Sequence, residues 1–498
     1  MRKPVIGLEI HTELKTNTKM FCDSLNDPNE RHPNINICPI CMGHPGTLPV
    51  ANKEAIEKTV MAGLALNCSI NEETFFERKN YFYPDLPKGY QITQYQKPFC
   101  EKGYLEIGEG KNIRITRIHL EEDAGRLQHV PDKDYSLVDY NRAGVPLMEL
   151  VTEPDFENGQ QVKQFAEELQ LIFRYLGVSD ADMEKGQMRV EVNISLTNDD
   201  GSWGTKAEIK NLNSIRAAAG AVDYEIQRQG DILDEGGKII QETRGWDDSK
   251  GVTFSQRSKE EAHDYRYFPE PDLPPVRIDA SWLELIKSRM TELPAQRRVR
   301  FLGYGLNKSQ IEVFTIARHL GNYYEHVASE IDSAAKDYHH KKGLPGDFSS
   351  ESGVASKLHS MAANYIITEF PPLFNMKGME IDDVEGLNIT PESFAELMVL
   401  IFHKELSSTG AKVVMKEMAE TGLHPEQIMK EKNLGQVSDA GELESIIQKV
   451  IDDNSKAVTD YKAGKEASLK FLVGMVMRES KGKANPQVAE ELIKKLTK

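Results

Sequence analysis

Charged and apolar residues alternate with a period of two in three segments of the chain. In residues 189–195 (RVEVNIS) the apolar positions are Val190, Val192 and Ile194. The same alternation occurs in residues 8–13 (LEIHTE) and 206–210 (KAEIK). Because successive side chains of a strand point to opposite faces, each segment predicts a strand with one apolar and one polar face. The polar faces carry ionisable groups, namely Glu9, His11, Glu13, Arg189, Glu191, Lys206, Glu208 and Lys210.

Two interpretations of this polar surface are open. In the first, it is the solvated face of an ordinary antiparallel sheet and has no chemical role. In the second, its carboxylates and imidazole bind a hard cation and serve phosphate chemistry. Residues 119–123 (HLEED) favour the second interpretation, because three consecutive carboxylates need solvent or cations to compensate their charge. Arg114, Arg117 and Arg126 supply some of that charge, and a divalent metal can supply the rest.

The hydrophobic pattern changes from strand-like to helical after a proline-rich segment at residues 267–275 (YFPEPDLPP). Amphipathic helices are predicted at residues 281–290, 308–324, 352–370 and 390–405, with Ser281, Ser309 and Thr390 as expected N-caps. A second break follows at residues 407–410 (SSTG). These patterns predict an α+β protein with a sheet-based domain at 1–290, a helical domain at 291–406 and a small all-helical tail at 407–498.

Composition narrows the class of protein. The 498 residues exceed what a single core organises. There is no run of about 18 apolar residues and no apolar stretch at the N-terminus, so we expect a cytoplasmic protein without membrane spans. Five cysteines in such a chain indicate reduced thiols or metal ligands.

The charge is unevenly distributed. The whole chain carries a net charge of -17, whereas residues 456–498 carry +5. In that tail, Leu469, Leu472, Val473, Val476 and Met477 follow helical spacing and leave basic residues outside the stripe. Either the basic side chains form a solvated helix face, or they bind a phosphate backbone.

The common nucleotide-binding signals are missing. The sequence contains no P-loop, no complete GxGxxG and no GxSxG nucleophile elbow, so an ATP site must be unconventional. Cys68 lies in a mainly apolar stretch and is predicted to be a core residue.

Longer strings of the sequence resemble one known family, the B subunits of aspartyl/glutamyl-tRNA amidotransferases. The resemblance runs nearly from end to end. It rests on residues 5–11 (VIGLEIH), 46–52 (GTLPVAN), 78–85 (RKNYFYPD), 88–92 (KGYQI), 119–125 (HLEEDAG), 141–147 (NRAGVPL), 210–214 (KNLNS), 241–244 (QETR), 264–272 (DYRYFPEPD), 435–439 (GQVSD) and 481–486 (KGKANP).

The resemblance implies a cradle domain, a helical domain and a YqeY-like tail that grips tRNA. It implies an enzyme, a carbon-nitrogen ligase that uses glutamine as nitrogen donor. The side-chain carboxylate of Asp-tRNA(Asn) or Glu-tRNA(Gln) is phosphorylated with ATP and then amidated by ammonia. The implied protein partners are an amidase (glutaminase) subunit and a small third subunit, which complete a heterotrimer. The implied nucleic-acid partner is mischarged tRNA and not DNA. The alternative is a tRNA-binding or editing module without catalysis.

The family pattern also assigns roles to residues. It implies a Mg²⁺ site at His11, Glu122, Glu191 and Glu208, with Glu9 either as a further ligand or as a residue that orients a ligand. Family members usually carry Asp at the position of Glu191, so the longer side chain can shift the carboxylate. Because Mg²⁺ prefers oxygen, His11 also suits Mn²⁺ or Zn²⁺. Catalytic roles are expected for Lys79, Lys88, Glu122, Asp123 and Glu149.

Three cysteines form an incomplete zinc motif. Cys38-Pro-Ile-Cys41 is half of a zinc knuckle, and Cys22 is the third thiol. Many relatives have a fourth cysteine where this chain has Ser24. Either a tetrahedral zinc site persists with Asp23, His32 or His44 as fourth ligand, or the three thiols lie in degenerate loops that no longer bind zinc.

Overall fold

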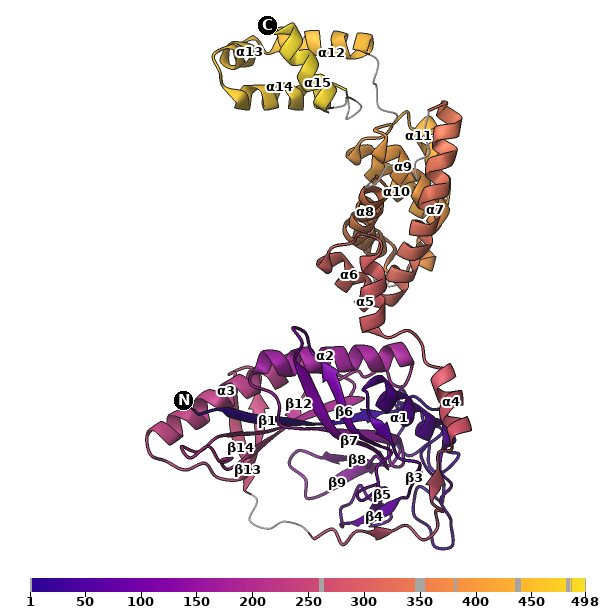
Figure 1. The fold of residues 1–498 in the computed structure, drawn as a ribbon, viewed down its shortest axis with the longest axis vertical. Coiled ribbons are helices and arrows are strands. Elements are labelled where there is room, and N and C mark those ends of the chain that lie inside the picture. The colour runs from indigo at the N-terminus through magenta and orange to yellow at the C-terminus, as the bar shows by residue number, and fades with distance from the viewer. Residues whose placement is uncertain are drawn as a thin grey trace. The chain divides into compact units, whose positions relative to one another are not determined.

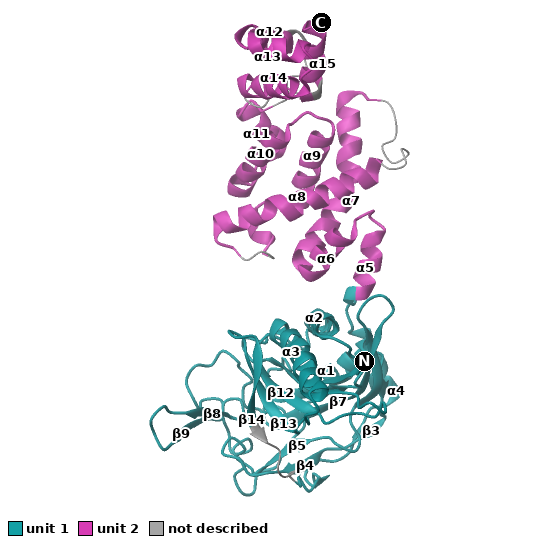
Figure 2. Ribbon diagram, turned by 90° about the vertical axis from the view of Figure 1, so that its left-hand side faces the viewer, with its two compact units in different colours: residues 1–294 teal, residues 295–498 magenta. Residues whose placement is uncertain are grey.

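The computed structural model describes residues 2–258, 264–344, 354–379, 383–434, 440–480, 484 and 486–497. The chain divides into two compact units, Met1–Pro294 and Ala295–Lys498 (Figure 2). The first unit contains the β-sheets, and the described part of the second is helical (Figure 1). This is the α+β class expected from the sequence. The division into three domains stays a prediction.

A mixed nine-stranded sheet forms the centre of the first unit. Its neighbouring strands are antiparallel except for the parallel pair β12 and β13. The strands, in order across the sheet, are β14 (Val252–Ser258), β13 (Glu242–Asp247), β12 (Ala207–Leu212), β11 (Met188–Leu196), β1 (Pro4–Glu13), β10 (Pro146–Thr152), β7 (Asn112–Glu122), β6 (Cys100–Glu106) and β2 (Ser69–Ile70).

Helices cover one face of this sheet (Figure 1). They are α1 (Lys53–Ala65), α2 (Gly159–Leu176) and α3 (Ile215–Asp234), with side chains of Asn52, Asn158 and Ser214 as N-caps. The predicted apolar faces of the strands lie on this side, and Leu8, Ile10 and Val192 are almost completely buried there. The burial pattern confirms the strand prediction and leaves the ionisable residues on the opposite face.

Smaller sheets complete the first unit. They are β15 (Phe268–Pro269) with β4 (Glu77–Asn80) and β5 (Tyr90–Thr93), β16 (Val276–Arg277) with β3 (Glu73–Thr74), and the hairpin β8 (Arg126–His129) with β9 (Ser136–Asp139). The proline-rich segment at residues 267–275, where the strand-like pattern ends, does not leave the first unit. Instead, β15 and β16 pair with short strands inside the first unit, which continues to Pro294 beyond α4 (Ala280–Ser288).

A first helical core occupies the part of the second unit up to Leu434. It is formed by α5 (Pro294–Leu302), α6 (Lys308–Ile316), α7 (Arg318–Lys342), α8 (Val354–Lys377), η2 (Glu385–Leu387), α9 (Pro391–Phe402), α10 (Ser408–Thr421) and α11 (Pro425–Glu431). The helix expected at 308–324 is two helices, because Ala317 between them has a non-helical ψ of 85°. Thr390 is an N-cap as predicted, whereas Asp279 and Asn307 replace Ser281 and Ser309.

The last helices form a separate small core. They are α12 (Ala440–Asp453), α13 (Ser455–Lys462), α14 (Glu466–Glu479) and α15 (Pro486–Leu496). Leu469, Leu472 and Val476 are buried as the helical stripe predicts. The family strings at 435–439 and, except for Ala484 and Pro486, at 481–486 lie outside the described residues. Among the helices that the structure describes, none is long and apolar enough to cross a membrane; the cytoplasmic location stays a prediction.

Candidate active site

A row of four ionisable residues crosses the polar face of the sheet. The strand register places Arg189 of β11 beside His11 of β1, His11 beside Glu149 of β10, and Glu149 beside His119 of β7. A parallel row on one side contains Glu191 and Glu9, and a row on the other side contains Glu13 and Glu121. Residues far apart in the sequence thus become neighbours on four adjacent strands.

His11 lies at the centre of three carboxylates. Its Nε2 is 3.3 Å from an oxygen of Glu149, 3.7 Å from Glu121 and 3.8 Å from Glu9. Burial disfavours the imidazolium, but the hydrogen bond to Glu149 and the three negative charges outweigh burial and raise the pKa of His11 to about 9. The arrangement therefore stabilises a positive charge at this place, and a bound metal would displace the proton.

Glu149 joins His11 to a second group of ligating side chains. His119 Nε2 is 3.4 Å from the same Glu149 oxygen and 3.7 Å from Glu121. Burial would raise the pKa of Glu149, but His119, His11 and Arg117 lower it well below its usual range. The ligand atoms of Glu9, His11 and Glu149, and likewise those of His119, Glu121 and Glu149, lie within 4.8 Å of one another. These groups have the donor atoms of a metal centre.

Glu191 and Glu208, the more distant expected ligands, meet at one lysine. Lys210 Nζ is 2.7 Å from Glu191 and 3.2 Å from Glu208. Glu191 is the cross-strand neighbour of Glu9, and burial together with the charges of Glu149 and Glu191 raises the pKa of Glu9. The polar face therefore continues from His11 to Lys210.

The structure places Glu122 apart from His11, which departs from the ligand set that the family pattern implies. The Glu122 carboxylate accepts hydrogen bonds from Lys88 Nζ at 2.5 Å and from the Ile92 amide at 2.9 Å. Glu121 occupies the face that was expected for Glu122. The signal was present in the sequence, because strand alternation puts Glu121 on the same face as His119 and puts Glu122 on the other.

Lys79 lies among aromatic rings beside the carboxylates. Its Nζ is 5.0 Å from the ring centre of Tyr265 and 5.7 Å from that of Tyr81. Burial would lower its pKa, but the charge of Glu121 has the largest opposing effect and raises the pKa of Lys79 overall. Lys79 is therefore a fixed cation near the two groups of metal-ligating residues.

The structure shows Asp123 in an ion-pair cluster. Its carboxylate is 3.1 Å from Arg189 and 3.6 Å from Arg142, and its Oδ1 accepts from the Ala124 amide. Although burial would raise the pKa of Asp123, the two arginines lower it. Glu13 lies beside Asp123, and burial together with the charge of Asp123 raises the pKa of Glu13 to about 8.

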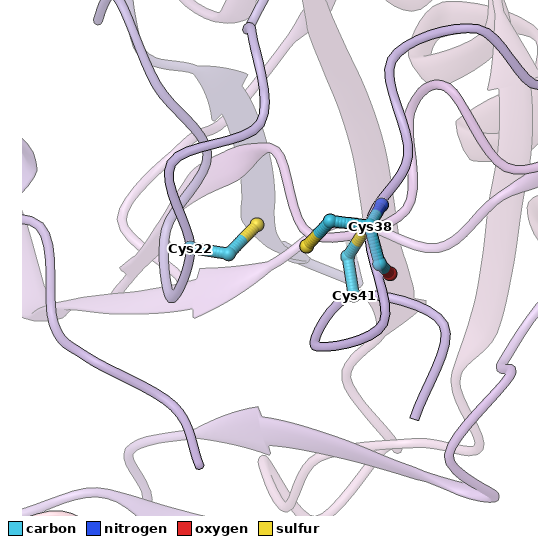
Figure 3. Close-up of side chains that lie close together, drawn as sticks. All are labelled: Cys22, Cys38 and Cys41. Atoms are coloured by element: carbon cyan, nitrogen blue, oxygen red, sulfur yellow. The ribbon is translucent and has the colours of Figure 1, made fainter. Parts of the chain in front are cut away.

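The three cysteines converge from two loops (Figure 3). The sulfur atoms of Cys22, Cys38 and Cys41 lie within 4.8 Å of one another. Ser24 Oγ is 3.9 Å from Cys41 Sγ, and the fully buried Lys19 places its Nζ 3.8 Å from the same sulfur. The hydrogen bond from Cys22 is the main cause that lowers the pKa of Cys41 to about 4. These contacts suit a thiolate-bound metal with a lysine that offsets negative charge.

Of the side chains considered as a fourth ligand, the structure pairs His32 with Glu30 at 2.9 Å. His44 lines a cavity of about 110 Å³ together with Cys22, Cys41, Lys88 and Glu122. Gly43 has a φ of 68°, and a Cβ at this position would come within 2.7 Å of the Lys88 side chain. This glycine therefore lets the cysteine loop pack closely against Lys88.

Comparisons with known proteins identify the family of this chain. The fold and the polar sheet face define the class of GatB/GatE catalytic domains, whose family model matches residues 4–284, and a GatB domain model matches residues 350–496. The chain belongs to the family of aspartyl/glutamyl-tRNA(Asn/Gln) amidotransferase B subunits. It is 48% identical over 498 residues to the B subunit from Carboxydothermus hydrogenoformans, with 98% of both chains covered. It is 46% identical to that from Dehalococcoides mccartyi, with 99% of this chain and 98% of the relative covered.

Proposed function

We propose that this chain is the subunit of a glutamine-dependent amidotransferase that activates and amidates the amino acid on Asp-tRNA(Asn), Glu-tRNA(Gln) or both. The observation that carries the proposal is the meeting of both groups of metal-ligating residues at Glu149. Family membership and the match of the catalytic domain support it.

The donor atoms fit Mg²⁺. Carboxylates dominate the set, and we propose Glu9, Glu121 and Glu149 as its oxygen ligands, with His11 and His119 as nitrogen donors or as proton-bearing partners of Glu149. Glu191, Glu208 and Lys210 lie next to this set. Bound Mg²⁺ would offset negative charge on ATP phosphates.

The reaction needs cations because two anions must meet. A carboxylate oxygen of the tRNA-bound amino acid attacks the γ-phosphorus, and ADP leaves. The resulting acyl phosphate has a stable leaving group, so ammonia can displace phosphate at the carbonyl carbon. We assign to Lys79 the stabilisation of phosphoryl oxygens, because it lies near Glu121 and Glu149. Lys88 and Glu122 form a charged pair in the wall of the 110 Å³ cavity and make that part of its lining polar.

The chain would act with partners. We propose an amidase (glutaminase) subunit that releases ammonia from glutamine and a small third subunit that completes a heterotrimer, because the relatives are named as B subunits of an amidotransferase. Mischarged tRNA would bind the basic tail through its phosphate backbone, in keeping with the second interpretation of the charge in residues 456–498.

The direct test is ATP hydrolysis by the assembled complex with ammonium as nitrogen donor. We expect phosphate release that requires Mg²⁺ and mischarged tRNA, together with formation of Gln-tRNA or Asn-tRNA. If the complex binds mischarged tRNA and never hydrolyses ATP, the alternative of a non-catalytic binding or editing module is correct.

We also propose that Cys22, Cys38 and Cys41 bind zinc, with a non-cysteine fourth ligand. Cys41→Ser is expected to reduce zinc content, measured by mass spectrometry of the metal, from stoichiometric to near zero, because one of three sulfur donors is lost. Cys68→Ala is the matched control, since Cys68 is a buried thiol in the hydrophobic core. If both variants contain equal amounts of zinc, or if the unsubstituted protein contains none, the three thiols do not bind zinc and lie in degenerate loops.

A further inference from the structure

Arg189 differs from the other cations of the polar face in where its partner lies. Lys210 pairs with Glu191 and Glu208, and Arg117 approaches Glu149, so these two cations neutralise carboxylates of the face itself. Arg189 pairs at 3.1 Å with Asp123, which follows the end of β7. Its charge is therefore held by a carboxylate outside the proposed ligand set.

Asp123 is a rigid anchor. It is 6% exposed, its backbone amide donates to the Val145 carbonyl, and its Oδ1 accepts from the Ala124 amide. Arg142 approaches the other oxygen at 3.6 Å and also donates to the backbone carbonyls of Ala124 and Gly125. These contacts fix the Asp123 carboxylate, and through it one side of the Arg189 guanidinium.

The Arg189 side chain is partly exposed on the polar face. Its side chain is 32% exposed although Arg189 lies directly beside His11 in the sheet. A guanidinium has five N–H donors in a planar fork, so an arginine held on one side by a carboxylate keeps donors for a second anion. Adjacent strands are about 5 Å apart, a separation that one tetrahedral phosphoryl group can bridge.

We propose that Arg189 binds the phosphoryl group that is transferred from ATP, and that Asp123 is the positioning residue that orients its guanidinium. The inference rests on the proposed function and adds a residue to it. In the first step, the O–P bond to the amino-acid carboxylate forms and the bond from phosphorus to the ADP oxygen breaks. Arg189 donates hydrogen bonds to a non-bridging oxygen and transfers no proton.

The same contact serves the second step. Ammonia attacks the carbonyl carbon, the C–O bond to phosphate breaks, and the nitrogen gives one proton to the departing phosphate to leave the amide. The negative charge that develops on the departing phosphate is shared among its oxygens, one of which Arg189 contacts, so the guanidinium stabilises the leaving group without reorientation.

Nucleotide binding tests the contact without depending on turnover. In the assembled complex with Mg²⁺, Arg189→Ala is expected to weaken ATP binding by about 10- to 100-fold and to leave ADP binding unchanged, because only ATP carries the γ-phosphoryl group. The matched control is Arg114→Ala, since Arg114 of β7 makes a two-pronged pair with Asp155 but is 66% exposed. Equal loss of ATP and ADP affinity, or loss of neither, would overturn the inference.

Chemical rescue tests the role of Arg189, and the substitution Asp123→Asn tests the role of its positioning residue. Guanidinium ion at millimolar concentration is expected to restore part of the phosphate release of Arg189→Ala and none in Arg114→Ala, which should need no rescue. Asp123→Asn is expected to lower kcat more than it raises KM for ATP, whereas a purely structural role would lower thermal stability with no selective effect on kcat. Failure of the unsubstituted complex to hydrolyse ATP would refute the proposed function; normal hydrolysis by Arg189→Ala would refute this inference alone.

Discussion

Glu149→Gln is expected to lower the rate of ATP-dependent amidation by about 10²- to 10³-fold, an effect comparable to removal of a preorganised charge from an active site. Glu149 Oε2 lies 3.3 Å from His11 Nε2 and 3.4 Å from His119 Nε2, and Glu149 belongs to both groups of ligating residues. The amide keeps the shape but removes the negative charge that holds these groups together. Product formation with mischarged tRNA and ammonium measures the change.

The control for this variant is Glu153→Gln. Glu153 follows the same strand β10, but its carboxylate accepts from Thr116 Oγ1 at 2.7 Å, away from both groups. We expect Glu153→Gln to amidate at the unsubstituted rate. Raising the Mg²⁺ concentration should partly restore Glu149→Gln if metal affinity is lost. An unchanged rate in Glu149→Gln would remove this residue from the catalytic centre.

Truncation after Leu434 is expected to raise the KM for mischarged tRNA by roughly 10-fold or more and to flatten its dependence on salt, because phosphate contacts of the tail are lost. The cut removes α12–α15, whose core is separate from that of the preceding helices. At saturating tRNA, kcat should change little. Measuring KM over a range of salt concentrations gives the slope for both proteins.

The position of this cut matters. The sequence places a boundary at residues 407–410, but α10 contributes Ala411, Val414 and Met418 to the first helical core. Truncation after Ser407 would therefore remove part of that core, so a change in tRNA binding could not be separated from a loss of stability. Lys470→Gln, on the exposed side of α14, is the milder companion variant and should reduce the salt slope in the same direction. An unchanged slope in the truncated protein would exclude the tail from the tRNA interface.

Much of the sheet could be predicted from alternation alone. Leu8, Ile10, Val190 and Val192 are buried as expected, because a two-residue period fixes the side of a strand on which each residue lies. The family resemblance implies Glu122 as the metal ligand. The two-residue period of the strand instead places Glu121, and not Glu122, on the face that carries His119. Helix ends were less well defined, since Asp279 and Asn307 compete with nearby serines as caps.

Sequence patterns are enough to predict the α+β class, the polar strand faces, the buried stripe of the tail and the family. Which charges meet depends on how the chain folds in three dimensions. Cross-strand register brings Arg189, His11, Glu149 and His119 into one row, and a loop brings Cys22 to Cys38 and Cys41. These contacts join residues that are far apart in the chain, so local periodicity carries no information about them; backbone hydrogen bonding between strands and the packing of loops fix them instead.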